Sequence, residues 1–109
     1  VKAFAAKVGQ EHGVDVKIEM VSSYNAIQFH ENCVDAVGRA AKKLGYSNMP
    51  AVSGAGHDAV YMAKLAPAGM IFIPCKDGIS HNPLEYSSYE DLALGANVML
   101  GTVVQILKK

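Results

Sequence analysis

Two histidines in glycine-rich loops, His57 and His81, are the residues of this sequence best suited to chemistry. His57 lies in VSGAGHDA, residues 52–59, and His81 lies in CKDGISHNPLEY, residues 75–86. Neutral imidazole is a common nitrogen ligand of zinc, and it also donates or accepts a proton readily near neutral pH. The two loops therefore point to metal binding or to proton transfer.

The VSGAGHDA loop has the features of a ligand-binding turn. Gly54 and Gly56 lack side chains, so a bound molecule could approach the backbone closely. The loop leads into an expected helix, whose first backbone N–H groups favour an anion such as a carboxylate. His57 could donate a hydrogen bond or a proton, and Asp58 could cap the helix or orient an imidazole. Taken alone, these residues are more simply explained as a glycine-rich turn before a capped helix.

Nucleophilic catalysis is not favoured by the sequence. Ser53, His57 and Asp58 are near neighbours, whereas a Ser-His-Asp triad is assembled in space, and no Gly-x-Ser-x-Gly elbow is present. Cys75 could act as a nucleophile with His81, but no second signal supports it. A catalytic zinc needs about three protein ligands, and the sequence has no HExxH, His-x-His or cysteine cluster. Without further ligands, a structural role explains His81 more simply.

Apolar residues recur at helical spacing in four stretches that are bounded by glycine, proline or capping residues. The predicted helices cover residues 1–12, 31–44 and 58–65, and a final helix that runs to the lysines at the end of the chain. For this last helix, Ser87 with Glu90 has the spacing of a capping box, and Ser88 with Asp91 fits it less ideally.

Two strands are predicted between the helices. Residues 14–20 alternate apolar and charged side chains, which indicates a strand with one exposed face. Residues 70–73 are apolar without alternation, which is typical of a strand covered on both faces. We therefore predict an α/β fold with helices packed on a mixed sheet, and a domain boundary near His30, where the pattern changes. His12 and His30 are expected to be solvated or structural.

The composition is typical of a globular domain. Half of the 109 residues are hydrophobic and 18% are charged, which indicates a packed core. Ten basic residues balance ten acidic ones, so nucleic acid is not an expected partner. No apolar run approaches the roughly 20 residues of a membrane span, and no signal peptide is visible, so we expect no membrane partner and a cytoplasmic protein. Cys33 and Cys75 are expected to be reduced thiols.

Three stretches taken together, SGAGHDA, MIFIPCKDGISHNPLEYS and EDLALGANVML, resemble a known family. They are similar to the C-terminal part of the zinc-dependent amidohydrolases that cleave N-carbamoyl-L-amino acids and related ureido compounds. Allantoate amidohydrolase and beta-ureidopropionase belong to the same group, within the M20 metallopeptidase-like family. The resemblance is strong over residues 31–109 and looser over residues 1–30.

The resemblance implies a role for each loop. His81 would be the family's last metal ligand in a centre of two divalent metals, with zinc or manganese expected. Gly56 would contact the substrate through its backbone, and His57 would bind the substrate or polarise the scissile carbonyl. Supporting roles are implied for Asp58, Gly78 and Glu85. A solvated loop residue is the alternative for Glu85.

The resemblance also implies that most of the active site lies upstream of this chain. The family's other metal ligands, its general-base glutamate and its carboxylate-binding arginine and asparagine have no counterpart here. In the whole enzyme, the metals would polarise the ureido carbonyl and activate a water whose proton the glutamate takes. Residues 1–30 would end a smaller dimerisation domain, and residues 31–109 would return to the metal-binding domain. The chain alone would be inactive.

The implied partners are a small carbamoyl or ureido substrate, the upstream remainder of the enzyme and a second copy in a homodimer. The chain starts at Val1 rather than at methionine, so we expect a processed chain or part of a longer polypeptide. Two alternatives stay open: a stand-alone, non-catalytic binding or assembly domain, and a peptidase branch of the M20 family. The histidine in GAGHDA argues against the peptidase branch.

Overall fold

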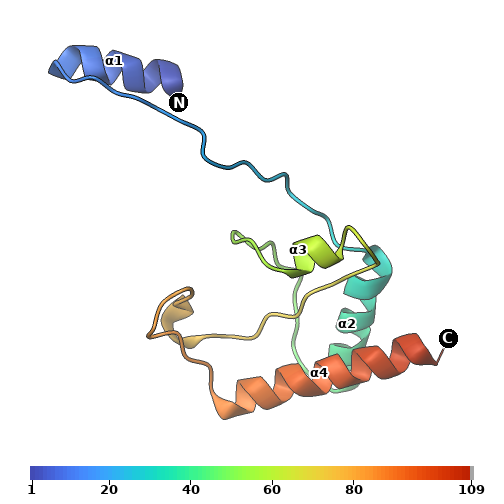
Figure 1. Ribbon diagram of the computed structural model, residues 1–109. Coiled ribbons are helices and arrows are strands. Elements are labelled where there is room, and N and C mark those ends of the chain that lie inside the picture. The colour runs from blue at the N-terminus through green and yellow to red at the C-terminus, as the bar shows by residue number, and fades with distance from the viewer. Residues whose placement is uncertain (109) are drawn as a thin grey trace.

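A computed structural model describes residues 1–108, which form four α-helices and one turn of 3-10 helix. The elements are α1 (Lys2–His12), α2 (Glu31–Lys43), α3 (Ala59–Met62), η1 (Lys76–Gly78) and α4 (Tyr89–Leu107). Figure 1 shows α2 and α4 crossing, with α1 set apart at the end of an extended segment. The Cα radius of gyration is 19.9 Å, against about 13 Å for a compact chain of this length. The described chain is therefore open.

The predicted helices are confirmed, with one of them shorter than expected. α1 ends at Gly13, which adopts φ 65° and donates its backbone N–H to carbonyls of the last turn. α2 begins after His30, whose Nδ1 accepts the N–H of Asn32 at 3.2 Å. His30 is thus a helix cap, within the structural role expected of it. The third helix was predicted to extend to Leu65, but it ends at Met62 and continues only as turns.

At the start of α4, the capping pair is Ser88 with Asp91 and not the preferred pair of Ser87 with Glu90. Ser88 is the N-cap: its Oγ accepts the backbone N–H of Asp91 at 3.0 Å and donates to that residue's carboxylate at 2.7 Å. Ser87 does not cap the helix. Its hydroxyl donates to the carbonyl of Pro74 at 2.9 Å, and this bond ties the start of α4 to the end of the apolar segment.

The prediction of helices on a mixed sheet is wrong, because residues 1–108 contain no β-strand. Residues 14–20 and 70–73 are extended, as their side-chain patterns suggest, but neither has a strand beside it. A strand forms only when a second segment pairs with its backbone N–H and C=O groups. No backbone hydrogen bond joins residues 15–29 or 70–73 to another segment of the described chain. Side-chain alternation does not report whether that second segment is present.

The small core lies where α2 meets α4. Its fully buried apolar residues are short side chains, namely Ala36, Ala40, Ala41 and Val98. Thr102 is buried beside them, and its hydroxyl donates to the carbonyl of Val98 at 2.7 Å, so no buried side-chain polar atom of residues 1–108 is left unpaired. Short side chains let these two helices approach closely, and this crossing is the one contact between helices in residues 1–108.

The apolar segment of residues 68–73 lies against both helices of this core. A Cβ built on Gly69 would lie 3.1 Å from Cys33 Cβ in α2, and one built on Gly95 of α4 would lie 2.6 Å from Ile73 Cγ2. Ile71 packs on the core cluster, whereas Phe72 faces outward and is 50% exposed. The segment is therefore covered on one face rather than on two.

Much apolar surface of α4 is exposed, including Leu92, Leu94, Met99, Leu100, Val103 and Ile106. By length and composition alone, α4 is the one helix of the described chain that could cross a membrane. The same test is passed by core helices of proteins that never enter a membrane, so it carries little weight by itself. The packing on α2 accounts for only one side of the helix.

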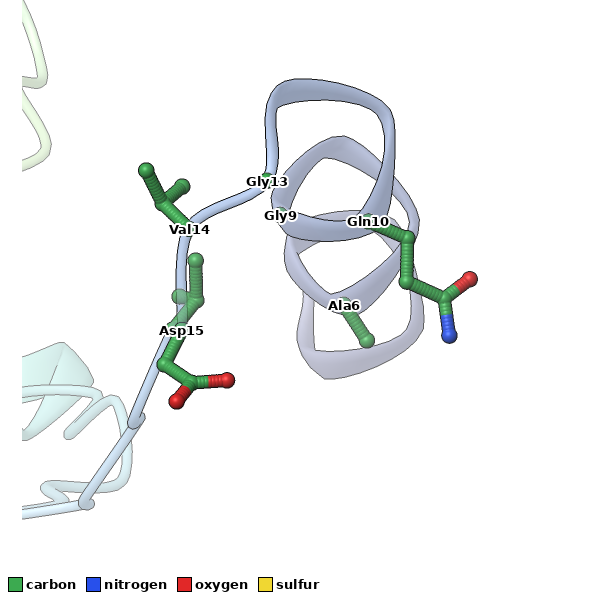
Figure 2. Close-up of a pocket in the computed structure, with 7 residues that line it drawn as sticks. Ala6, Gly9, Gln10, Gly13, Val14 and Asp15 are labelled. Atoms are coloured by element: carbon green, nitrogen blue, oxygen red, sulfur yellow. The ribbon is translucent and has the colours of Figure 1, made fainter.

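A shallow hollow at the end of α1 arises because the chain folds back on this helix (Figure 2). Val14 donates its N–H to the carbonyl of Gly9 at 3.0 Å. A Cβ at position 9 would lie 2.8 Å from the Val14 carbonyl oxygen, so glycine is required for the close approach. Asp15 is the one ionisable residue that lines the hollow, which leaves the candidate chemistry to the histidine loops.

We expect Gly95→Ala to destabilise the protein and Gly101→Ala not to. The new methyl group at position 95 would overlap Ile73 Cγ2, at 2.6 Å. Overpacking costs about 1–3 kcal/mol, which exceeds the roughly 0.5–1 kcal/mol that alanine contributes through helix propensity. At position 101 the nearest atom, Ala40 Cβ, lies at 3.4 Å, an ordinary contact. Urea unfolding of both variants measures the difference, and equal shifts would contradict this packing.

Candidate functional site

The structure brings the two candidate histidines together. The ring centroids of His57 and His81 lie 6.4 Å apart, with an angle of 56° between the ring planes. The two residues come from different loops: His57 contacts Phe72 in the apolar segment of residues 68–73, and the loop of His81 follows that segment directly in the sequence. Neither ring is fully buried: His57 is half-buried and His81 is exposed. The two imidazoles therefore share one open face of the molecule.

The ring of His57 is fixed from two sides. Its Nε2 lies 2.8 Å from the hydroxyl oxygen of Ser53, four residues earlier in the same loop. The edge of the ring also meets Phe72, with centroids 5.6 Å apart and an interplanar angle of 68°. The T-shaped contact with Phe72 links the first loop to the apolar segment.

The second loop is closed at its base and carries His81 near its tip. Lys76 donates its backbone N–H to the carbonyl of Tyr86 at 2.7 Å, so the ends of the loop meet. Gly78 has φ 67°, a conformation that a glycine adopts without strain, as its predicted loop-shaping role requires. Asp77 and His81 also have positive φ, at 56° and 55°. These two non-glycine residues make the loop a demanding one to fold.

Glu85 contacts His81 through the backbone and not through the imidazole. One oxygen of its carboxylate, Oε2, accepts the His81 N–H at 2.9 Å. Because His81 has the positive φ of this turn, the bond to its N–H holds the turn that presents the imidazole ring. Glu85 therefore supports the histidine loop by fixing its backbone, and the imidazole remains free of it.

Gly56 and Asp58 lie beside His57 and have few contacts. A Cβ built on Gly56 would have no atom within 4 Å, so crowding within residues 1–108 does not explain a glycine there. Asp58 occupies the N-cap position of α3, but its side chain makes no capping hydrogen bond. The expected cap is thus absent, and Asp58 contributes only its carbonyl, which accepts the N–H of Tyr61 at 2.9 Å.

The nucleophilic alternatives gain little from the geometry. Ser53 does contact His57, but the Asp58 side chain makes no hydrogen bond to that imidazole within the described chain, so no triad is assembled. Cys75 is a half-buried free thiol, and so is Cys33. A hydrogen bond between Cys75 and His81 would mark an activated thiol. None of the hydrogen bonds of residues 1–108 joins these two side chains.

The described residues do not form a metal site by themselves. Nowhere in residues 1–108 do three His, Cys, Asp or Glu side chains gather closely enough to bind one ion. The exposed imidazole of His81 is chemically suited to serve as one ligand, and a bound metal would need further ligands from elsewhere. A single imidazole ligand fits a metal site to which residues outside this chain would supply the other ligands.

Sequence reasoning missed two residues that position His57. Ser53 had been considered only as a nucleophile, and Phe72 only as part of a buried strand. A hydroxyl four residues before a histidine, across a turn with two glycines, was the available signal for Ser53. The contact with Phe72 joins residues that are far apart in the sequence, so no local pattern could have revealed it.

The chain is similar to a set of hydrolases. The family model described as Peptidase family M20/M25/M40 matches residues 2–105. N-carbamoyl-L-amino-acid amidohydrolase of Rhizobium meliloti is 45% identical over 105 residues, which are 96% of this chain and 25% of that protein. Ureidoglycolate hydrolase of Arabidopsis thaliana is 44% identical over 73 residues, which are 67% of this chain and 15% of that protein.

A solved structure shows the same likeness. The crystal structure of an amidase of the hydantoinase/carbamoylase family from Burkholderia multivorans has a TM-score of 0.86 and 40% identity, and the match covers 95% of this chain and 25% of that one. This chain thus spans about a quarter of the length of these two relatives, which match nearly all of it. The predicted family is confirmed: because the family model matches residues 2–105, the chain belongs to Peptidase family M20/M25/M40.

Proposed function

We propose that this chain acts as the C-terminal part of a metal-dependent amidohydrolase that cleaves the C–N bond of N-carbamoyl amino acids or related ureido compounds. The observation that carries the proposal is the meeting of His57 and His81, at 6.4 Å between ring centroids, in two loops whose motifs resemble that group. The relatives with such names support the choice of substrate class. The family name by itself would equally suit a peptidase.

In this proposal, His81 supplies one ligand of the metal centre. Its loop presents an exposed imidazole, and the Glu85 carboxylate accepts the backbone N–H of His81 and so fixes the backbone there. Bound divalent metal, zinc or manganese, would supply a Lewis acid for the carbonyl and an activated water. The remaining ligands and the general base would come from residues outside this chain.

His57 and Gly56 form the substrate-contacting part of the chain. The half-buried imidazole of His57 offers a hydrogen bond to a carbonyl or to a carboxylate, and its position is set before any substrate arrives. Gly56 is open to its surroundings, so a substrate could approach its backbone N–H. These residues would orient a small ureido compound against the metal centre.

The domain division and the dimer belong to the same proposal. Residues 1–30 would end a smaller dimerisation domain, and residues 31–109 would form part of the metal-binding domain. The absence of contacts between α1 and any other helix of the described chain supports a boundary near His30. A homodimer in the cytoplasm completes the proposal.

Replacing His81 tests the proposal directly. In the whole protein that contains this chain, we expect His81→Ala to lose bound divalent metal and to lower hydrolysis of an N-carbamoyl-L-amino acid by on the order of 100-fold or more. His12→Ala, which changes an exposed histidine at the end of α1, is the matched control and should keep both metal and activity. Metal analysis and ammonia release measure the two effects. Unchanged metal content in His81→Ala, or cleavage of dipeptides alone, would contradict the proposal.

Gly56→Ala tests the substrate contact. The new methyl group meets no atom of residues 1–108 within 4 Å, so we expect the folded chain to tolerate it. It would instead crowd a substrate at the backbone, and we expect KM to rise about tenfold, as for roughly 1.4 kcal/mol of lost binding. Gly101→Ala in α4, where the nearest atom to the new methyl group lies at 3.4 Å, is the control and should leave KM unchanged. Equal kinetics for the two variants would remove Gly56 from the binding site.

A further inference from the structure

Among the side chains of the two histidine loops, the hydroxyl group of Ser53 takes part in the most hydrogen bonds. Its oxygen lies 2.8 Å from His57 Nε2 and accepts the backbone N–H of Ala55 at 3.1 Å. It also lies 3.1 Å from the carbonyl oxygen of Ala55, to which it can donate. Ser53 is half-buried, so these contacts are partly shielded from water.

A serine hydroxyl has one proton and two lone pairs, and the three contacts of Ser53 can be made in two arrangements. One lone pair takes the Ala55 N–H. When the proton goes to the Ala55 carbonyl, the second lone pair accepts a proton carried by His57 Nε2. When the proton goes to Nε2 instead, His57 carries its own proton on Nδ1. To change between these two states the hydroxyl rotates and the imidazole proton exchanges through solvent from one ring nitrogen to the other, with no movement of the ring.

We propose that Ser53 is a positioning residue for His57, which occupies Nε2 and so leaves Nδ1 as the nitrogen that meets the substrate. The inference rests on the proposed function, because it assumes that His57 contacts substrate. In both hydrogen-bonding states Nε2 is already bonded, so Nδ1 is the ring nitrogen with a free lone pair or a free proton. The edge contact with Phe72 fixes the plane of the ring, and the hydroxyl fixes its rotation within that plane.

Ser53 takes the role of orienting the His57 imidazole, which the sequence had suggested for Asp58. Asp58 is the acidic neighbour best placed by sequence to orient the imidazole, but its side chain makes no hydrogen bond to His57 within residues 1–108. A neutral hydroxyl serves His57 whether or not the ring is charged, since it can accept from one form and donate to the other. An ionised carboxylate can only accept, so it would require a proton on the nitrogen that it faces and would stabilise the charged ring.

The test compares Ser53→Ala, Ser53→Thr and Ser47→Ala in the whole enzyme that contains this chain. Ser47 is the control, because it is exposed and its side chain makes no hydrogen bond in the described structure. Histidine labelled with nitrogen-15 reports the state of each ring nitrogen, and His57→Gln assigns the signals. We expect Ser53→Ala to change the Nε2 and Nδ1 signals of His57, while Ser53→Thr and Ser47→Ala keep them close to the original.

The same variants give a kinetic readout with an N-carbamoyl-L-amino acid. We expect Ser53→Ala to lower kcat/KM roughly three- to tenfold, as for the loss of one hydrogen bond, and Ser53→Thr to restore it. Unchanged nitrogen signals in Ser53→Ala would overturn the inference, even if His57→Gln is inactive. Changed signals with a fully active His57→Gln would keep the positioning role and contradict only the proposed contact between His57 and substrate.

Discussion

The close approach of α2 and α4 is the constraint on which the rest of the described structure depends. Alanines of α2 and small residues of α4 meet at this crossing, and the apolar segment of residues 68–73 lies against both helices. The N–H of His30, at the start of α2, donates to the carbonyl of Ala68 and fixes one end of this segment. Ser87, just before α4, donates to Pro74 and fixes the other end. The two histidine loops are thereby placed relative to one another.

Local sequence signals predicted the helices well and the sheet badly. Periodicity, Gly13 and the serines before α4 gave correct helices, since these are local features of the backbone. The prediction of Ser87 as the preferred cap was wrong, because both serines fit the spacing of a capping box. The hydrogen bond that engages Ser87 goes to Pro74, which is distant in the sequence. The strands failed because residues 14–20 and 70–73 need partner strands, which residues 1–108 do not supply.

The sequence predicted which histidines form the candidate site, but not the contacts that hold their two loops in place. Spacing and composition singled out His57 and His81, and the structure brings their rings within 6.4 Å. The roles of Ser53, Phe72 and Glu85 depend on side-chain and backbone directions that no pattern of residue types reveals. The exposed apolar residues of α4, together with Phe72, fit the proposal that further parts of a larger enzyme cover this surface.

The central claim is that this chain completes a metal site within a larger hydrolase. The most direct test is the mass of the intact polypeptide purified from its natural source, measured together with its metal content. The account predicts a mass about four times the 11.6 kDa of these 109 residues, because the chain spans about a quarter of its relatives, and it predicts bound divalent metal. A mass that matches these 109 residues, with no metal bound, would contradict it.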